Sequence, residues 1–391
     1  RGPNGFEWWM VYFALYNGSP QRSQAIDRVH FLDRRLYVDG PTTERTPGYH
    51  PPPAVPTFCD RFDTPSAWCN KWIANGDWQV NDGELVQRSR DGDCDALIQA
   101  PPGTHYLAEV GLRFADGDGR IAGMVAWQDG ASHAVRVGLD RQAQAWFYES
   151  AGQTQQFPLP NFQWDGWHTI RIEKNAERLS VDIDGIPAPG ESVFELPEDS
   201  AGVPGLFTRN ASVRFRGMTY TRGWDEFDAG IRGWNALQGE WAVADDGLHT
   251  TAAAHTQTLK GDALPCYEWN VQVIPGKPVD NQQGRAGGYA VWIDDNNWLL
   301  TAFNANLTEL QVTGKRNGEV LDERVANLGQ PATSARNLRV VKLPDRVIVC
   351  VDGQERLSCE GAWPPSRVGL FAEDLPCRFS SDMLYERIAD E

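Results

Sequence analysis

The sequence has no uninterrupted apolar run long enough to span a lipid bilayer, and it has no excess of basic residues. Its 391 residues include 36 Lys and Arg against 53 Asp and Glu, which gives a net charge of −17. Binding to nucleic acid or to an anionic membrane surface requires a basic face, so this balance disfavours both partners. A neutral ligand such as a sugar is compatible with it.

Familiar catalytic and metal-binding motifs are missing as well. The chain contains no HExxH, GxSxG or P-loop pattern, and no Cys and His spacing typical of zinc sites. With 53 acidic residues, pairs of carboxylates arise by chance, so spacing alone assigns no glycosidase pair. The sequence therefore predicts that the chain has no complete active site of its own and requires no cofactor.

The seven cysteines leave two alternatives open. Cys59 lies close to Cys69 in sequence and Cys350 lies close to Cys359, so each pair could close a small disulfide loop. Free buried thiols are the other alternative. The remaining cysteines are Cys94, Cys266 and Cys377.

An internal repeat is the strongest signal in the sequence. The segment FDTPSAWCNKWIANGDWQVNDGELVQ, which begins at Phe62, resembles FDAGIRGWNALQGEWAVADDGLHT, which begins at Phe227. Five landmark pairs hold nearly one offset along the chain: Phe62 and Phe227 (165), Trp78 and Trp241 (163), Trp127 and Trp292 (165), Asp184 and Asp352 (168), Phe207 and Phe371 (164). A period this long indicates a duplicated domain rather than a solenoid. We therefore expect two domains, at residues 57–222 and 223–391.

Each copy has the pattern of an all-β domain. Apolar and polar residues alternate in YLAEVGLRF, WHTIRIEK and LSVDIDG, which is the two-residue period of half-buried strands. Asp184-Gly185 and Asp352-Gly353 are typical hairpin turns. No long amphipathic helix is evident, so many short strands with regular turns predict a two-sheet β-sandwich in each copy.

Residues 1–44 differ from both copies and contain a few predicted strands, too few to fold alone. We expect them to expose apolar surface or to pack on the first sandwich. Five prolines between Pro47 and Pro56 make residues 45–56 a stiff, extended linker.

The first segment, GPNGFEWWMVYFALYNGSPQRSQAIDRVHFLDRRLYVDGPT, resembles the last blade of a glycoside hydrolase family 43 β-propeller. The resemblance implies that Arg22 matches an arginine facing the active-site pocket, while Phe13 stands where a histidine often follows the Val-Tyr pair. The family's catalytic carboxylates lie upstream of this blade. We therefore expect a piece of a longer glycoside hydrolase of the arabinan or xylan type, secreted or periplasmic, with an upstream catalytic propeller as the partner of these domains. The sequence as given begins at Arg1 and contains no recognisable signal peptide, which leaves secretion open.

The two repeats resemble concanavalin-like jelly-roll domains, including family 66 carbohydrate-binding modules. The opening FCDRFD and the closing GLF motifs carry this resemblance over roughly residues 57–389. It implies two tandem jelly-roll β-sandwiches that bind a polysaccharide or oligosaccharide.

Three aromatic residues are the candidate sugar-binding positions. Trp146 and Tyr148 lie two residues apart and so on one face of a predicted strand, with Phe147 on the opposite face and toward the core. Trp298 has no aromatic counterpart in the first copy, whereas Trp292 pairs with Trp127 and is expected in a shared core. Trp is also a common core residue of β-sandwiches, which is the alternative for each position.

Asp116 and Asp118 form a candidate calcium site. Alternate carboxylates in the Gly-rich segment ADGDGR suit an ion that takes several oxygen ligands, although an acidic hairpin turn explains the same pattern.

Three functions are compatible with these features. The chain could be the non-catalytic region of a secreted glycoside hydrolase, in which the sandwiches bind glycan or brace the catalytic propeller. It could instead be a self-contained sugar hydrolase with its active site in one jelly roll. The third alternative is a structural spacer without a ligand.

Overall fold

A computed structural model describes most of the chain, and nearly all of it is β-structure. The described residues are 8–15, 22–32, 35–38, 57–64, 68, 70–115, 120–128, 133–196, 201–223, 225–226, 234–244, 247–250, 255–277, 284–329 and 335–387. Every named element is a β-strand, and among these residues only Trp68, Asn70 and Lys71 are helical. This confirms the predicted all-β class. Within the same residues there is no helix with the length and apolar character needed to cross a membrane.

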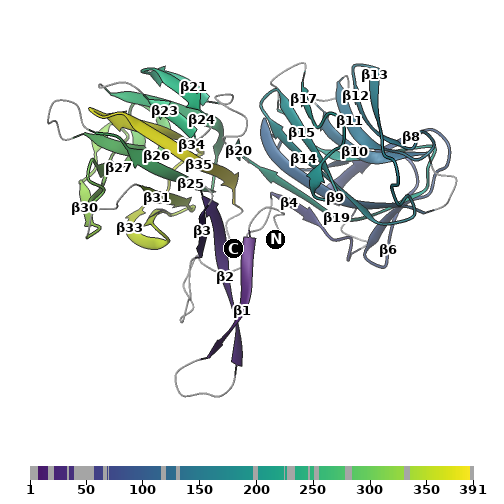
Figure 1. The fold of residues 1–391 in the computed structure, drawn as a ribbon, viewed down its shortest axis with the longest axis horizontal. Helices are drawn as coiled ribbons and strands as arrows, with labels where there is room; N and C mark the ends of the chain where they lie inside the picture. Colours follow the sequence, from purple (N-terminus) through teal and green to yellow (C-terminus); the bar gives the residue numbers. More distant parts are fainter. Residues whose placement is uncertain are drawn as a thin grey trace. The chain divides into compact units, whose positions relative to one another are not determined.

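The chain forms two compact units, and each contains one β-sandwich (Figure 1). One unit consists of Val55–Arg222. The other combines Arg1–Ala54 with Gly223–Glu391.

The first sandwich consists of two antiparallel sheets. Its front sheet contains, in spatial order, β13 (Gln153–Pro158), β12 (Ala145–Ser150), β11 (Ala134–Asp140), β10 (Ile121–Gln128), β18 (Gly205–Arg209), β8 (Asp93–Ile98) and β5 (Trp72–Ala74). Its back sheet contains β16 (Ile186–Pro187), β15 (Arg178–Ile183), β14 (His168–Asn175), β9 (His105–Phe114), β19 (Val213–Arg222), β7 (Glu84–Gln87) and β6 (Trp78–Asn81). Two short strands extend the back sheet, β17 (Val193–Glu195) beside β15 and β4 (Phe58–Asp60) beside β19.

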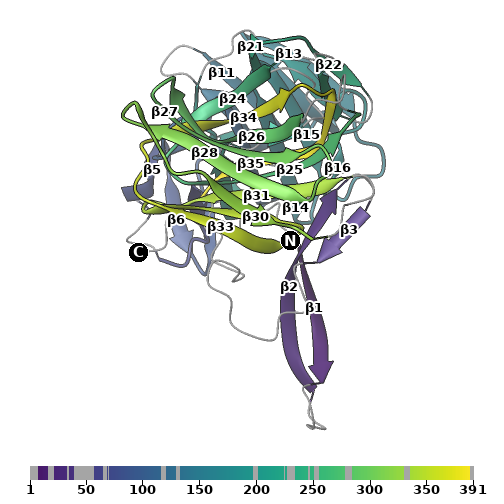
Figure 2. The same ribbon diagram turned by 90° about the vertical axis from the view of Figure 1, so that its left-hand side faces the viewer.

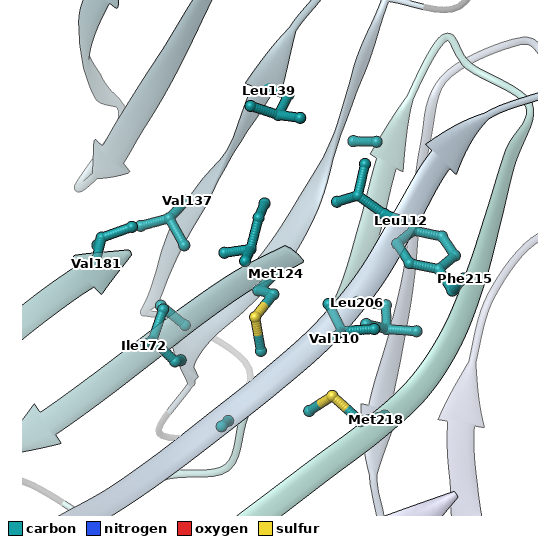
Figure 3. Close-up of a cluster of buried hydrophobic side chains, with 14 of the residues drawn as sticks. Val110, Leu112, Met124, Val137, Leu139, Ile172, Val181, Leu206, Phe215 and Met218 are labelled. Atoms are coloured by element: carbon teal, nitrogen blue, oxygen red, sulfur yellow. The ribbon is translucent and has the colours of Figure 1, made fainter. Parts of the chain in front are cut away.

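The core of the first sandwich lies between these sheets because alternate residues of each strand point inward. Met124, Val137 and Leu206 come from the front sheet and Val110 and Phe215 from the back sheet, and all five are fully buried. Figure 3 shows these side chains meeting between the strands. Burial of such side chains stabilises the fold by about 1.5–3 kcal/mol each.

The second sandwich has the same two-sheet form (Figure 2). Its front sheet contains β21 (Trp234–Gln238), β24 (Thr256–Leu264), β34 (Ser366–Glu373), β26 (Arg285–Asp294), β27 (Asn297–Asn304), β28 (Glu309–Arg316) and β29 (Glu319–Val320), with β30 (Arg324–Asn327) also beside β28. Its back sheet contains β22 (Trp241–Ala244), β23 (Gly247–Thr250), β35 (Cys377–Glu386), β25 (Tyr267–Pro275), β31 (Arg336–Lys342), β32 (Arg346–Val351) and β33 (Gln354–Glu360), with β20 (Asp225–Glu226) beside β35.

The strand order is the same in both sandwiches. In the front sheets, β12-β11-β10-β18-β8-β5 corresponds to β28-β27-β26-β34-β24-β21. In the back sheets, β15-β14-β9-β19-β7-β6 corresponds to β32-β31-β25-β35-β23-β22. A buried tyrosine joins the sheets at the same place in each, since Tyr106 on β9 donates to the carbonyl of Ala126 on β10, and Tyr267 on β25 donates to the carbonyl of Ala290 on β26.

The Asp-Gly hairpins also correspond. Asp184 and Asp352 have φ of 53° and 50°, and the following glycines, Gly185 and Gly353, have φ of 80° and 79°. Glycine accepts such a left-handed backbone without strain, and aspartate tolerates it better than most residues. Each aspartate also accepts a backbone hydrogen bond at 2.9 Å, from Thr169 and Asn337 respectively.

Three strands near the start of the chain form a separate antiparallel sheet, in the order β1 (Trp8–Leu15), β2 (Arg22–Leu32) and β3 (Arg35–Val38). Val11 and Phe13 on β1 are 55% and 72% exposed, as expected for strands that lack a second layer. The segment belongs to the unit of the second sandwich, and β2 contacts β35. Exposed apolar surface, the first of the two alternatives expected for this segment, is therefore observed at Val11 and Phe13.

Within the described residues the structure has no disulfide at Cys59, Cys94, Cys266, Cys350, Cys359 or Cys377. Cys350 is opposite Glu355 and Cys359 is opposite Val347, and the two side chains lie in different apolar clusters. A disulfide between them is therefore absent. Cys69, the expected partner of Cys59, lies outside the described residues.

We expect a fragment of residues 55–222 to fold alone, because this unit has its own two-sheet core. Circular dichroism should record one cooperative thermal transition for the fragment, within a few degrees of a transition of the full chain. A fragment without a cooperative transition would show that the first sandwich depends on the rest of the chain.

Candidate functional site

Trp146 and Tyr148, the aromatic residues proposed to contact sugar in the first copy, are buried in its core. The Trp146 ring is inaccessible, stacks on Phe157 with centroids 4.6 Å apart, and donates from Nε1 to the carbonyl of Pro189 at 2.7 Å. Tyr148 is 6% exposed and stacks on Phe194 at 4.1 Å. Neither ring has a free face for a ligand, so the predicted surface position of both is wrong.

The alternation of side chains along β12 is as predicted, but the face of the strand that points into the core is the opposite one. Phe147 points away from Trp146 and Tyr148, as the two-residue period requires, but it lies on the outer face of the front sheet. There it contacts Phe207 on β18, with ring centroids 5.9 Å apart. Both faces of β12 carry aromatic residues, so the sequence could not tell which face was the core.

Ion pairs cover this outer face of the first front sheet. Arg209 on β18 binds both oxygens of Asp93, at 2.9 and 3.0 Å, and also binds Glu149 at 3.0 Å. Arg136 on β11 lies over the Phe207 ring and pairs with Asp95 at 3.0 Å. Every carboxylate of this network is therefore engaged by an arginine.

The arginines control the ionisation of Glu149. Burial alone raises the pKa of this carboxyl, but the hydrogen bond and charge of Arg209, with the charge of Arg136, outweigh it and hold the pKa below its usual value. Hydrogen bonds to Asp93 and Glu149 raise the pKa of Arg209. A glycosidase acid needs a raised pKa, so Glu149 is poorly suited to protonate a leaving group.

The corresponding outer face of the second sandwich is different, because it carries partly exposed aromatic rings. Trp292 on β26 and Trp298 on β27 are directly opposite each other and are both partly exposed. They pack against Tyr289, with ring centroids 4.7 and 6.0 Å away, and Tyr289 also contacts Phe371 on β34. We call Tyr289, Trp292, Trp298 and Phe371 the aromatic face. Trp298, a candidate sugar-binding residue from the sequence, is therefore partly exposed on this face.

Trp292 reaches this surface because of a β-bulge. Arg209 lies opposite Ile121 in the first copy, and Glu373 lies opposite Arg285 at the equivalent place in the second. Equivalent residues of the two copies are therefore 164 positions apart in sequence. Trp127 then corresponds to Val291, and both are buried in their cores just after an irregularity in the strand pairing. Trp292 is one residue further along and points to the other face. Its predicted role as a core counterpart of Trp127 is therefore wrong.

Polar groups lie beside the aromatic face. The hydroxyl of Tyr289 donates to Gln257 Oε1 at 2.8 Å. Arg285 lies over the Phe371 ring, with its guanidinium carbon 5.6 Å from the centroid, and pairs with Glu373 at 3.0 Å. His255 contacts the Phe371 ring edge-on at 5.0 Å. Exposed rings with a few fixed hydrogen-bonding groups suit a sugar, which has apolar ring faces and polar hydroxyls.

The remaining candidate residues cannot be assigned to a site. Asp116 and Asp118 lie outside the described residues, and the parts of the chain that are described contain no group of three His, Cys, Asp or Glu side chains placed to hold a metal ion. The backbone of Arg22 begins β2, but its side chain is not among those described.

No family model and no curated protein matches the sequence. Among solved structures, the carbohydrate-binding module CBM66 from Bacillus subtilis is 16% identical with a TM-score of 0.34, and the match covers 39% of this chain and 96% of that one. The Crh5 transglycosylase in complex with NAG is 11% identical with a TM-score of 0.36, covering 42% and 83%. The Bacillus licheniformis beta-glucanase is 14% identical with a TM-score of 0.32, covering 42% and 97%.

Because Trp146 is a core residue, Trp146→Ala should destabilise the first sandwich by about 3–5 kcal/mol. Urea unfolding followed by fluorescence measures this change. Trp298→Ala is the matched control, since its ring is partly exposed and should cost less than half as much. Equal losses from the two substitutions would contradict the assignment.

Glu149→Gln should lower stability at neutral pH, because it removes a carboxylate held between Arg136 and Arg209. The folded-state pKa of Glu149 is below the unfolded value of about 4.3, so this contribution is complete above that pH and is lost as the pH falls further. The free energies of unfolding of the two proteins should therefore differ at neutral pH and converge as the pH falls below about 4.3. A constant difference over this range would argue against the ion pairs.

Proposed function

We propose that this chain is a glycan-binding region in which the second sandwich carries the binding surface. The observation that carries the proposal is the pair of partly exposed indoles, Trp292 and Trp298, beside the fixed polar groups of Arg285, Glu373 and Gln257. Indole rings can stack on the apolar face of a sugar ring, while the polar groups set its orientation.

The first sandwich would then support the second rather than bind glycan. Its outer rings, Phe147 and Phe207, are each 1% exposed, and Arg136 and Arg209 close the face by pairing with carboxylates. Trp146 and Tyr148, the candidates in the first copy, are buried and are therefore not proposed as glycan contacts. We also propose that the two sandwiches arose by duplication, which the shared strand order and the corresponding Asp-Gly turns support.

The family resemblance of residues 1–44 is the basis of our proposal for the protein that contains this region. We propose that residues 1–44 are the remnant of a propeller blade from a secreted glycoside hydrolase, joined by a linker at residues 45–56. The three antiparallel strands β1 to β3 and the exposed Val11 and Phe13 support this proposal, because such a sheet needs neighbours to cover its apolar residues. Catalysis would then belong to the upstream propeller.

We expect Trp292→Ala and Trp298→Ala each to weaken glycan binding at least tenfold, which corresponds to about 1.4 kcal/mol. Affinity electrophoresis against a panel of plant and microbial polysaccharides, followed by calorimetry on the best ligand, measures this loss. Trp241→Ala is the matched control, because this ring is also partly buried in the second sandwich but lies on the back sheet.

The same panel separates the alternatives. If no polysaccharide retards the wild-type chain, the spacer alternative is favoured. If the purified chain hydrolyses a glycan and one Asp or Glu substitution abolishes turnover, the jelly-roll hydrolase is favoured instead.

A further inference from the structure

We infer that the aromatic face of the second sandwich selects an acidic glycan, in which the carboxylate of a uronic acid residue pairs with Lys315 or Arg367. This inference rests on the proposed function and specifies the class of sugar. It comes from the strand register of the front sheet, which places two cations in line with the two indoles.

The row consists of Arg367, Trp292, Trp298 and Lys315 on the adjacent strands β34, β26, β27 and β28. Arg367 is directly opposite Trp292, Trp292 is opposite Trp298, and Trp298 is opposite Lys315. Directly opposite residues of an antiparallel pair point to the same face, with Cβ atoms about 4.5–5.5 Å apart. The two indoles are therefore flanked on both sides by a positive charge.

The alternation of side chains along β34 and β28 supports this placement. On β34, Val368 and Leu370 point into the core, so Arg367 and Phe371 lie on the outer face. On β28, Leu310 and Val312 point into the core, and Lys315 lies on the opposite face.

Neither flanking cation has a carboxylate or an aromatic ring as a partner within the described residues. Other cations of this sandwich are engaged, since Arg285 pairs with Glu373, Arg336 pairs with Asp352, and Arg316 lies over the Trp363 ring. Lys315 and Arg367 have no such contact with any residue that the structure describes, and Arg367 is exposed.

The nearby hairpin carries two acidic residues, Asp294 and Asp295, and neither forms an ion pair with Lys315 or Arg367 among the residues that the structure describes. The carboxylate of Asp294, two residues beyond Trp292, accepts hydrogen bonds from the backbone of Asn296 at 2.8 Å and from the side chain of Asn297 at 3.0 Å. The chain has a net charge of −17, so two cations that have no carboxylate partner among the described residues and lie beside partly exposed indoles are a local exception, which a negatively charged ligand would match.

A uronic acid residue fits this row in both shape and charge. It keeps the flat apolar face that stacks on an indole, and it carries a carboxylate at the edge of the ring. A residue stacked on Trp292 or Trp298 could direct that carboxylate toward the adjacent cation and form a charge-assisted hydrogen bond. The first sandwich offers no equivalent, because Arg136 and Arg209 already bind its own carboxylates.

The test compares acidic polymers with neutral counterparts of the same backbone. Polygalacturonate and alginate are each used as such and after chemical reduction of their carboxyl groups, and binding to the full chain is measured by affinity electrophoresis and calorimetry. We expect at least one acidic polymer to bind ten times more tightly than its reduced form. The double variant Lys315→Gln with Arg367→Gln should lose this preference, whereas Trp298→Ala should lose binding to both forms.

A second double variant, Lys277→Gln with Arg346→Gln, is the matched control, because it removes the same charge from the second sandwich outside the aromatic face and should retain the preference. Equal affinity for acidic and reduced polymers, or an unchanged preference in the Lys315 and Arg367 variant, would overturn the inference. Binding of polyglutamate as tight as that of the acidic glycan would also overturn it, since the face would then recognise charge rather than sugar.

These results are distinguishable from failure of the proposed function. If neutral glycans bind through Trp292 and Trp298 and acidic ones do not, the proposed function stands and the uronate inference falls. If no glycan of either kind binds, both fall.

Discussion

The two-residue period of the β-strand is the constraint on which the rest of this structure depends. It divides every front strand into residues that fill the core and residues that form an outer face. A shift of one residue along a strand moves a side chain from one face to the other. Val291 therefore lies in the core, whereas the next residue, Trp292, lies on the outer face. The same rule that builds two similar cores therefore allows their outer faces to diverge.

That divergence separates the two sandwiches. In the first, Phe207 is covered by Arg136, and all neighbouring carboxylates are paired. In the second, Phe371 belongs to a wider aromatic face that ends in two partly exposed indoles. Ion pairs at a surface contribute modestly to stability. A partly exposed indole leaves apolar surface in contact with water until a ligand covers it. The glycan-binding proposal for the second sandwich follows from this contrast.

The sequence predicted the β-class and the two Asp-Gly turns, because alternation and turn chemistry are local properties. It could not predict which face of β12 points into the core, because Trp146, Phe147 and Tyr148 are all aromatic. That face is determined by packing against the back sheet, which the local sequence does not show. The sequence also could not reveal the row of Arg367, Trp292, Trp298 and Lys315, because register joins residues up to 75 positions apart in sequence.

Arg209 and Glu373 occupy the same position on the corresponding strands β18 and β34, with opposite charges. Adjacent domains of similar sequence can exchange strands while they fold. If β34 entered the first sandwich, Glu373 would face Asp93 and Glu149, the carboxylates that Arg209 binds there. If β18 entered the second, Arg209 would face Arg285. Each exchange would place like charges together, so the opposite charges of Arg209 and Glu373 favour the native pairing of each strand over the exchanged one.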